Sequence, residues 1–246
     1  MYEALRYIPR HSDHSLRGRA SLVFTLLTYY VWRRELNRVR ESQGRVRLRV
    51  LDIGCGPGSL IKCLELWFPE VEIIGLDQNQ ELLGIAKSRC QRMIALRGEA
   101  CSIPVRDESA DVVFALHIVE HLRNPSRFFA EAARVICPGG LLAFATPNPA
   151  CLSAKIMGSK WKGYSDPTHI SLHEPSFWRQ AAEDARFKIL RHGTTGLSGL
   201  PLLGTTPLGL IHWIPTLLCG HFPWTLGEAY ICTAMRQPPA GLPSMD

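Results

Sequence analysis

Two aspartates and a run of glycines carry the clearest chemistry in this sequence. Asp52 precedes the turn segment Gly54–Gly58, and Asp77 ends the next apolar run. Glycines permit a tight turn and a close approach of the backbone to a ligand. A dinucleotide-binding GxGxxG pattern would need glycine at position 59, where this chain has serine. The pattern therefore predicts a ligand site that differs from a dinucleotide pyrophosphate site.

The two carboxylates suit opposite ends of one ligand. Asp52 stands where it can receive a cationic amine, and Asp77 stands where a carboxylate can accept hydrogen bonds from both hydroxyls of a ribose. S-adenosylmethionine (SAM) contains both groups. We expect SAM to bind here.

Two histidine-containing segments form a second group of reactive residues. Residues 117–121 read HIVEH, which would place His117 and His121 on one face of a helical turn. Residues 166–169 read DPTH. We expect His121 and His169 to act as bases or orienting groups toward an acceptor, because histidine titrates near neutral pH. The alternative is that both histidines are structural.

Alternating apolar and helix-length segments must position these groups. We predict strands at residues 46–53, 71–76, 93–96, 112–116, 141–145, 187–192 and 228–236, and helices at 20–40, 59–68, 80–90, 125–136 and 175–185. Such alternation is typical of parallel βαβ units. The predicted fold class is therefore α/β, a Rossmann-like and mostly parallel sheet with helices on both faces.

Composition and charge limit the classes of protein. The eight cysteines are scattered without a CxxC pair, which favours a reduced, cytoplasmic protein over a zinc ribbon. The apolar run 22–32 is shorter than the roughly 20 residues of a bilayer span. The net charge of +6 is concentrated in residues 1–50, which hold eleven arginines and four acids. That region can attract the phosphates of lipids or RNA, or it can form a solvated helix face.

Residues 197–225 contain no lysine, arginine, aspartate or glutamate. This segment could cover an apolar acceptor or contact a membrane interface at its periphery. A homodimer contact and local packing are the alternatives.

Several central motifs resemble those of class I SAM-dependent methyltransferases. Residues 52–58 resemble the family's first motif, 97–104 the loop beside adenine, 111–122 the fourth strand and the loop over the methyl group, and 134–140 the turn before the fifth strand. The resemblance implies a seven-stranded sheet with an antiparallel last strand, and methyltransferase activity. It also implies a set of SAM-contacting residues: Asp52, Ile53, Gly54, Cys55, Gly56, Asp77, Gln78, Glu99, Ala100, Leu116 and Arg17.

Within that family the chain is similar to the branch that contains ubiquinone-biosynthesis O-methyltransferases. Some of its members, like small-RNA 2′-O-methyltransferases, carry ExxEH where this chain has HxxEH and bind a divalent metal. That match would make ligands of His117, Glu120, His121 and His169. Histidine at position 117 disfavours magnesium and favours a softer ion such as zinc or iron. We assign no metal ligand from the sequence.

The sequence predicts four parts and one activity. The parts are an N-terminal helical lid (1–45), a SAM-binding core (46–196), an apolar insertion on the acceptor side (197–226) and a final core strand (227–236). The activity is methyl transfer from SAM to oxygen, nitrogen or carbon of a small-molecule acceptor, which could be lipid-like. A metal-assisted RNA 2′-O-methyltransferase and a non-catalytic SAM-binding partner of another methyltransferase are competing hypotheses. Nucleic acid is disfavoured as a partner because no aromatic stacking platform is interleaved with the arginines.

Overall fold

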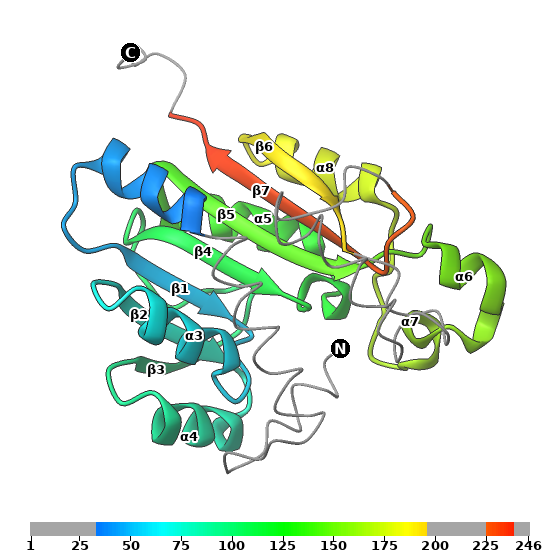
Figure 1. Cartoon of the computed structure of the whole chain (residues 1–246), viewed down its shortest axis with the longest axis horizontal. Helices are drawn as coiled ribbons and strands as arrows, with labels where there is room; N and C mark the ends of the chain where they lie inside the picture. The colour runs from blue at the N-terminus through cyan, green and yellow to red at the C-terminus, as the bar shows by residue number, and fades with distance from the viewer. Residues whose placement is uncertain (1–32, 196–224, 239–246) are drawn as a thin grey trace.

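A seven-stranded sheet forms the centre of the computed structural model, which describes residues 33–195 and 225–238 (Figure 1). Its strand order is β3-β2-β1-β4-β5-β7-β6. The strands are β1 (Arg49–Ile53), β2 (Glu72–Asp77), β3 (Ile94–Arg97), β4 (Ala110–Leu116), β5 (Ile136–Pro147), β6 (Phe187–Thr194) and β7 (Ala229–Arg236). Strands β1 to β5 pair in parallel, and β7 is antiparallel to both of its neighbours. The predicted fold class is confirmed.

Helices cover both faces of the sheet because the central strands are apolar on both faces. In β4, Val112 and Phe114 join the core with α3 (Ser59–Trp67), α4 (Gln80–Arg89) and the helix at residues 33–43. Val113 and Ala115 point to the other face, where α5 (Pro125–Val135) and α8 (Pro175–Asp184) pack. A continuous apolar run is what a parallel strand buried on both faces requires.

The helix at residues 33–43 is the described end of the predicted N-terminal lid. Leu36 and Val39 are buried in the core against the sheet, and Arg191 of β6 lies 3.0 Å from the carboxylate of Glu35. These residues therefore contribute to the core. The rest of the lid, including Arg17, and most of the segment 197–225 lie outside the described residues, as does most of the predicted helix 20–40.

Several N-terminal arginines form ion pairs within the fold. The fully buried carboxylate of Asp111 accepts from the backbone and guanidinium of Arg49, with Nη2 at 2.8 Å from Oδ1, and Arg45 lies 3.2 Å away. The hydrogen bonds to Asp111 raise the pKa of Arg49. Arg40 pairs with Glu70 at 3.0 Å. This part of the basic N-terminal region serves the fold, whatever else the region binds.

The largest differences from the predicted element boundaries are at the starts of β1 and β5. β1 begins at Arg49, because Val46 is 84% exposed and lies outside the sheet. β5 begins at Ile136, where a turn was expected, because Ile136 already pairs with Ala110 across a register shift.

A set of short helices after β5 was not predicted. It comprises α6 (Leu152–Met157), the 3₁₀ turn η2 (Gly158–Lys160) and α7 (Lys162–Ser165), and it extends beyond the sheet (Figure 1). No helix among the described residues is long and apolar enough to cross a bilayer.

Candidate active site

The carboxyl ends of β1, β2 and β4 bring three predicted site residues to one edge of the sheet. In the register of the sheet, Asp52 of β1 is paired with Gly75 of β2 and with Phe114 of β4. Asp77 and Leu116 end their own strands. Ligands of open parallel α/β sheets bind at this edge, so the topology places these residues where the sequence predicted.

Left-handed backbone explains the glycines of the turn after β1. Gly54, Gly56 and Gly58 have φ values of 68°, 51° and 78°. A Cβ on Gly54 would lie 2.4 Å from Cδ1 of Ile118, and one on Gly58 would lie 3.1 Å from the Cα of Ala86. Glycine is therefore required by backbone conformation and by contacts with other parts of this protein.

The turn is fastened to the end of β2. Gly54 N and Cys55 N donate to the carbonyl of Leu76 at 2.8 and 3.0 Å. The backbone N–H of Gly56 donates to Oδ2 of Asp77 at 2.8 Å, and Asn79 N donates to Oδ1 at the same distance. The carboxylate of Asp77 is thus fixed beside the glycine turn, with lone pairs left over for a ligand.

Asp52 is a buried carboxyl group next to a second one. Its residue is 3% exposed. Burial, and then the nearby charge of Asp77, raise the pKa of Asp52 from 3.8 to about 8. A cation bound against Asp52 would favour its ionised form. The structure therefore fits a ligand that presents an ammonium group here.

The residues expected beside adenine lie in the loop after β3. Gly98 N donates to the carbonyl of Asp77 at 3.2 Å, which holds this loop against the end of β2. Glu99 is exposed and forms an isolated bridge with Ser102, whereas Ala100 is buried. Gln78, which follows β2, is exposed.

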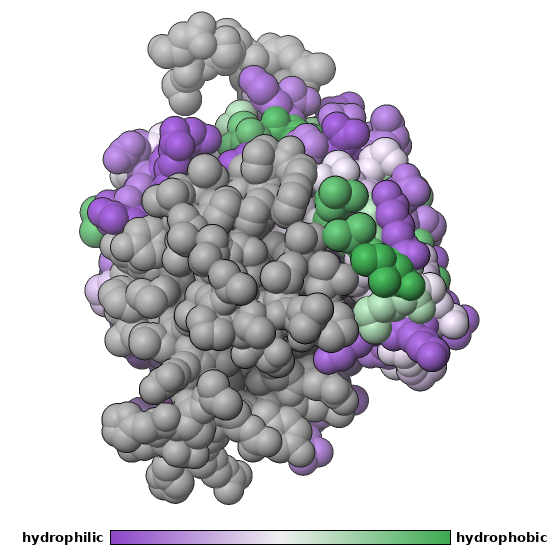
Figure 2. Space-filling model, turned by 45° about the vertical axis from the view of Figure 1, so that its right-hand side comes forward, coloured by the Kyte–Doolittle hydropathy of each residue, from purple (hydrophilic) through white to green (hydrophobic). Residues whose placement is uncertain are grey.

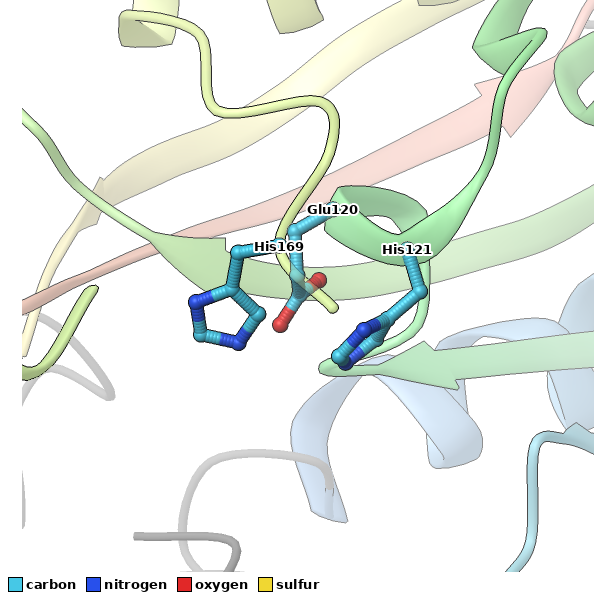
Figure 3. A group of neighbouring side chains, drawn as sticks. All are labelled: Glu120, His121 and His169. Atoms are coloured by element: carbon cyan, nitrogen blue, oxygen red, sulfur yellow. The ribbon is translucent and has the colours of Figure 1, made fainter. Parts of the chain in front are cut away.

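A second cluster comprises Glu120, His121 and His169 (Figure 3). Glu120 and His121 belong to the 3₁₀ turn η1 (Val119–His121) after β4, and His169 comes from the loop after α7. One ligand atom from each of the three side chains lies within 4.8 Å of the others. The structure therefore brings together the two histidines that the sequence selected and Glu120, which the family match had named as a possible metal ligand.

Main-chain carbonyls orient both imidazole rings. Nδ1 of His121 lies 3.0 Å from the carbonyl of Thr168, and Nδ1 of His169 lies 2.8 Å from that of Gly163. A carbonyl only accepts, so each Nδ1 carries the hydrogen and the neutral ring keeps its lone pair on Nε2. Each ring can take up a proton or bind a metal ion through Nε2.

Glu120 is fully buried in this cluster. Neither of its carboxylate oxygens has a hydrogen-bond partner among the described residues. Nδ1 of His117 lies 3.3 Å from Oε1 of Glu120. A buried carboxylate surrounded by imidazoles is costly unless a proton or a cation joins it.

His117 does not share a helical face with His121, so that expectation was wrong. His117 has φ +57° and precedes the 3₁₀ turn, and its N–H donates to the carbonyl of Ala145 at 2.7 Å. Left-handed backbone at a non-glycine residue is uncommon and cannot be read from periodicity.

An Asx turn that begins at Asp166 positions His169. Oδ1 of Asp166 accepts from Thr168 N at 2.9 Å and from its hydroxyl at 2.6 Å, and these bonds lower the pKa of Asp166. Such Asx turns are a known use of aspartate. Oδ2 of Asp166 lies 3.8 Å from Nε2 of His169, where its charge would stabilise a protonated ring.

The anchor of this loop was missed by sequence reasoning. Glu228, just before β7, accepts from Nε1 of Trp161 at 3.0 Å and from the hydroxyl of Ser153. These residues lie 67 and 75 positions from Glu228 in the chain. No local pattern reports such a contact.

Comparison with known proteins agrees with this geometry. Residues 51–144 match the family model described as a methyltransferase domain. The chain is 34% identical over 102 residues to a probable S-adenosylmethionine-dependent methyltransferase of Mycobacterium tuberculosis, a match covering 40% of this chain and 35% of that protein. It is 32% identical over 126 residues to a malonyl-[acyl-carrier protein] O-methyltransferase of Methylococcus capsulatus, covering 50% and 45%.

Solved structures share the fold at low identity. A putative sarcosine dimethylglycine methyltransferase of Galdieria sulphuraria has a TM-score of 0.63 at 18% identity, over 92% of this chain and 89% of that one. Magnesium protoporphyrin IX methyltransferase of Synechocystis, solved with bound SAH, has a TM-score of 0.62 at 18% identity, over 96% and 94%.

The curated matches span 30–45% of the length of the first four relatives. Within that segment the chain is similar to SAM-dependent methyltransferases, and its fold is shared by solved methyltransferase structures.

Proposed function

We propose that this protein binds SAM at the carboxyl ends of β1, β2 and β4 and transfers its methyl group to a small-molecule acceptor. The observation that carries this proposal is the pair Asp52 and Asp77 on adjacent strand ends, joined by the glycine turn. Asp52 would bind the ammonium group, because a buried carboxyl with a pKa of about 8 gains from a cationic partner. Asp77 would accept from the ribose hydroxyls.

The remaining predicted cofactor contacts are part of the same proposal. They are Ile53, Gly54, Cys55 and Gly56 in the turn, Gln78 after β2, Glu99 and Ala100 after β3, and Leu116 at the end of β4. Bound SAM supplies a methyl group on a positively charged sulfur. The chain's own residues then have to exclude water, orient the acceptor and remove its proton.

His169 and His121 are suited to the last of these tasks. Nε2 of His169 can take the proton of a hydroxyl or amine, and Asp166 at 3.8 Å would stabilise the resulting charge. His121 lies beside it, with 4.9 Å between ring centroids. Because the rings are held by backbone carbonyls, they face the cluster in a defined tautomer.

A second reading assigns the cluster to a divalent metal ion. Glu120, His121 and His169 form a set of two imidazoles and one carboxylate that fits a borderline ion such as zinc or iron. The bound ion would lower the pKa of an acceptor hydroxyl. His117, near Glu120, would hold that carboxylate in place. The specific observation in favour is the buried carboxylate of Glu120 without a hydrogen-bond partner among the described residues.

The acceptor class is proposed from the acceptors of similar proteins. Relatives named above act on an acyl-carrier-protein-bound malonyl group and on a porphyrin, so small and hydrophobic acceptors are represented among similar proteins. Membership of the ubiquinone-biosynthesis O-methyltransferase branch, a homodimer, peripheral membrane contact and a cytoplasmic location belong to the same proposal. Salt-dependent RNA binding and metal-dependent turnover would distinguish the RNA 2′-O-methyltransferase alternative. SAM binding without turnover would distinguish the non-catalytic alternative.

Calorimetric titration tests the proposal directly. We expect SAM to bind the full chain and nicotinamide dinucleotides not to compete. Turnover is then sought by mass spectrometry, as products heavier by one methylene in an extract supplied with SAM. SAM binding without any product would support the non-catalytic alternative, and absence of SAM binding would contradict the proposed function.

A further inference from the structure

Residues 152–165, which we call the α6–α7 protrusion, form an exposed basic and apolar surface beyond the edge of the sheet (Figure 1). Its lysines 155, 160 and 162 are all exposed. Residues 150–165 contain no aspartate or glutamate. Ile156 is 65% exposed and Tyr164 48% exposed in the same short stretch. The protrusion is therefore positively charged and partly hydrophobic.

Exposed hydrophobic residues concentrate at this place. Six large apolar side chains are exposed among the described residues, and three of them, Ile156, Tyr164 and Ile170, fall within fifteen positions of one another. The molecular surface on the side that carries α6 and α7 shows hydrophobic residues directly beside hydrophilic ones (Figure 2). Clustering of this kind marks an interaction surface more often than scattered exposed residues do.

The protrusion is held in a defined conformation. Trp161 is 3% exposed and donates from Nε1 to Glu228 at 3.0 Å, and Ser153 donates to the other oxygen of the same carboxylate. Cys151, Ala154 and Trp161 form a small core of their own. The buried residues of the protrusion thus anchor it, while the three lysines, Ile156 and Tyr164 stay exposed.

The same segment borders the candidate active site. The carbonyl of Gly163 accepts from His169, and the carbonyl of Thr168, three residues beyond the protrusion, accepts from His121. Whatever binds the protrusion is held next to the histidine cluster.

We propose that the α6–α7 protrusion docks this protein on a bilayer surface that contains anionic lipids. The three lysines would lie at the headgroups, with their aliphatic stems along the interface, while Ile156 and Tyr164 enter the boundary of the acyl chains. Tyrosine favours this depth because its ring is apolar while its hydroxyl group stays hydrated. Docking would present the histidine cluster to a membrane-borne acceptor, a consequence that rests on the proposed function.

Charge and hydrophobicity together favour this occupant over RNA. Lysines attract phosphates of either kind. Contact of an exposed isoleucine with a sugar–phosphate backbone yields no hydrophobic free energy, whereas its burial among acyl chains does. RNA binding through the same residues is therefore the competing outcome of the test.

Vesicle co-sedimentation of the full chain tests the proposal. We compare phosphatidylcholine vesicles with vesicles that also contain phosphatidylglycerol, and expect binding only to the second. The variant K155E/K160E/K162E should lose about tenfold or more of its binding. The variant I156S/Y164S leaves charge unchanged and should also bind less.

A matched control has the same change in net charge at exposed residues far from the protrusion, K62E/R106E/K188E. It should bind within about twofold of the unmodified chain. The proposal is overturned if K155E/K160E/K162E loses no more vesicle binding than this control, or if the unmodified chain binds neutral vesicles equally well. It is also overturned if the protrusion variants lose RNA binding but keep vesicle binding.

Calorimetric SAM titration of each variant separates this result from the proposed function. Retained SAM affinity shows that a loss of vesicle binding is not a loss of fold. If the unmodified chain fails to bind SAM, the proposed function fails, while the vesicle comparison still decides the docking.

Discussion

Asp52→Asn is expected to stabilise the protein in the absence of SAM, and increasingly so at higher pH. The folded chain holds the pKa of Asp52 at about 8, against 3.8 for the ordinary group, because the carboxyl is buried next to Asp77. The unfolded chain therefore loses this proton at lower pH than the folded chain does. Relative to the asparagine variant, the wild-type protein should lose stability as the pH rises from about 4 to about 8 and should change little above that.

The size of the effect follows from the two pKa values of Asp52. Their difference corresponds to an upper limit of about 6 kcal/mol in the free energy of unfolding. Relaxation of solvent and protein around the ionised carboxylate reduces this limit. We therefore expect the stability difference between the variant and the wild type to grow by about 2–4 kcal/mol between pH 5 and pH 8.

Urea denaturation at the two pH values measures this difference. Asp184→Asn on α8 serves as a matched control, because Asp184 is exposed and the substitution is chemically the same. Saturating SAM should narrow the gap at pH 8, because only the wild-type carboxylate can pair with the ammonium group. A stability difference that stays constant from pH 5 to pH 8 would refute the reasoning about Asp52.

Three further predictions concern the rest of the site. Asp77→Ala should weaken SAM binding by about 1–3 kcal/mol, and an unchanged calorimetric affinity would contradict its assignment to the ribose. His169→Gln should lower kcat by about 10²-fold or more while SAM affinity stays within about twofold; equal loss of both would indicate a structural histidine. Under the metal-ion reading of the cluster, zinc should bind with a stoichiometry of one, and Glu120→Gln should weaken zinc binding by at least about tenfold; zinc binding that is unchanged by this substitution would exclude the cluster as its site.

The sheet could be predicted because each of its strands carries its own signal. β4 is apolar from Val112 to Leu116, which indicates a parallel strand covered on both faces, and this run is buried except for its partly exposed last residue. The residue types identified the candidate site, and the predicted parallel topology gave its place at the carboxyl ends of the strands. Once parallel strands are predicted, Asp52 and Asp77 must meet at one edge.

The start of β5 shows where local signals mislead. Pro138, Gly139 and Gly140 are typical of a turn, yet they belong to a strand. Gly140 is needed because a Cβ would lie 2.7 Å from the carbonyl of Asp111 on β4. The reason for the glycine is a tertiary contact, which the sequence does not display.

The histidine cluster was predicted in composition but not in geometry. The sequence selected His121 and His169 from the segments in which they stand, HIVEH and DPTH. Two features could be seen only in the structure. They are the left-handed backbone at His117 and the lack of a hydrogen-bond partner for the Glu120 carboxylate among the described residues. Both depend on packing of η1 against β5 and the loop after α7, with Ser171 N donating to the carbonyl of Glu120 at 2.9 Å.

The proposed cofactor half and the proposed acceptor half of the site owe their geometry to different parts of the chain. The cofactor half is built from strand ends and the turn between them, so its hydrogen bonds join neighbouring elements of the sheet. The acceptor half depends on carbonyls of Gly163 and Thr168, whose segment is anchored to the sheet by Glu228 through Trp161. Because that anchor lies outside the cofactor half, substitutions in the protrusion can alter the tautomers and positions of the two histidines while SAM binding is preserved. Acceptor specificity can therefore diverge in this fold without redesign of the cofactor site.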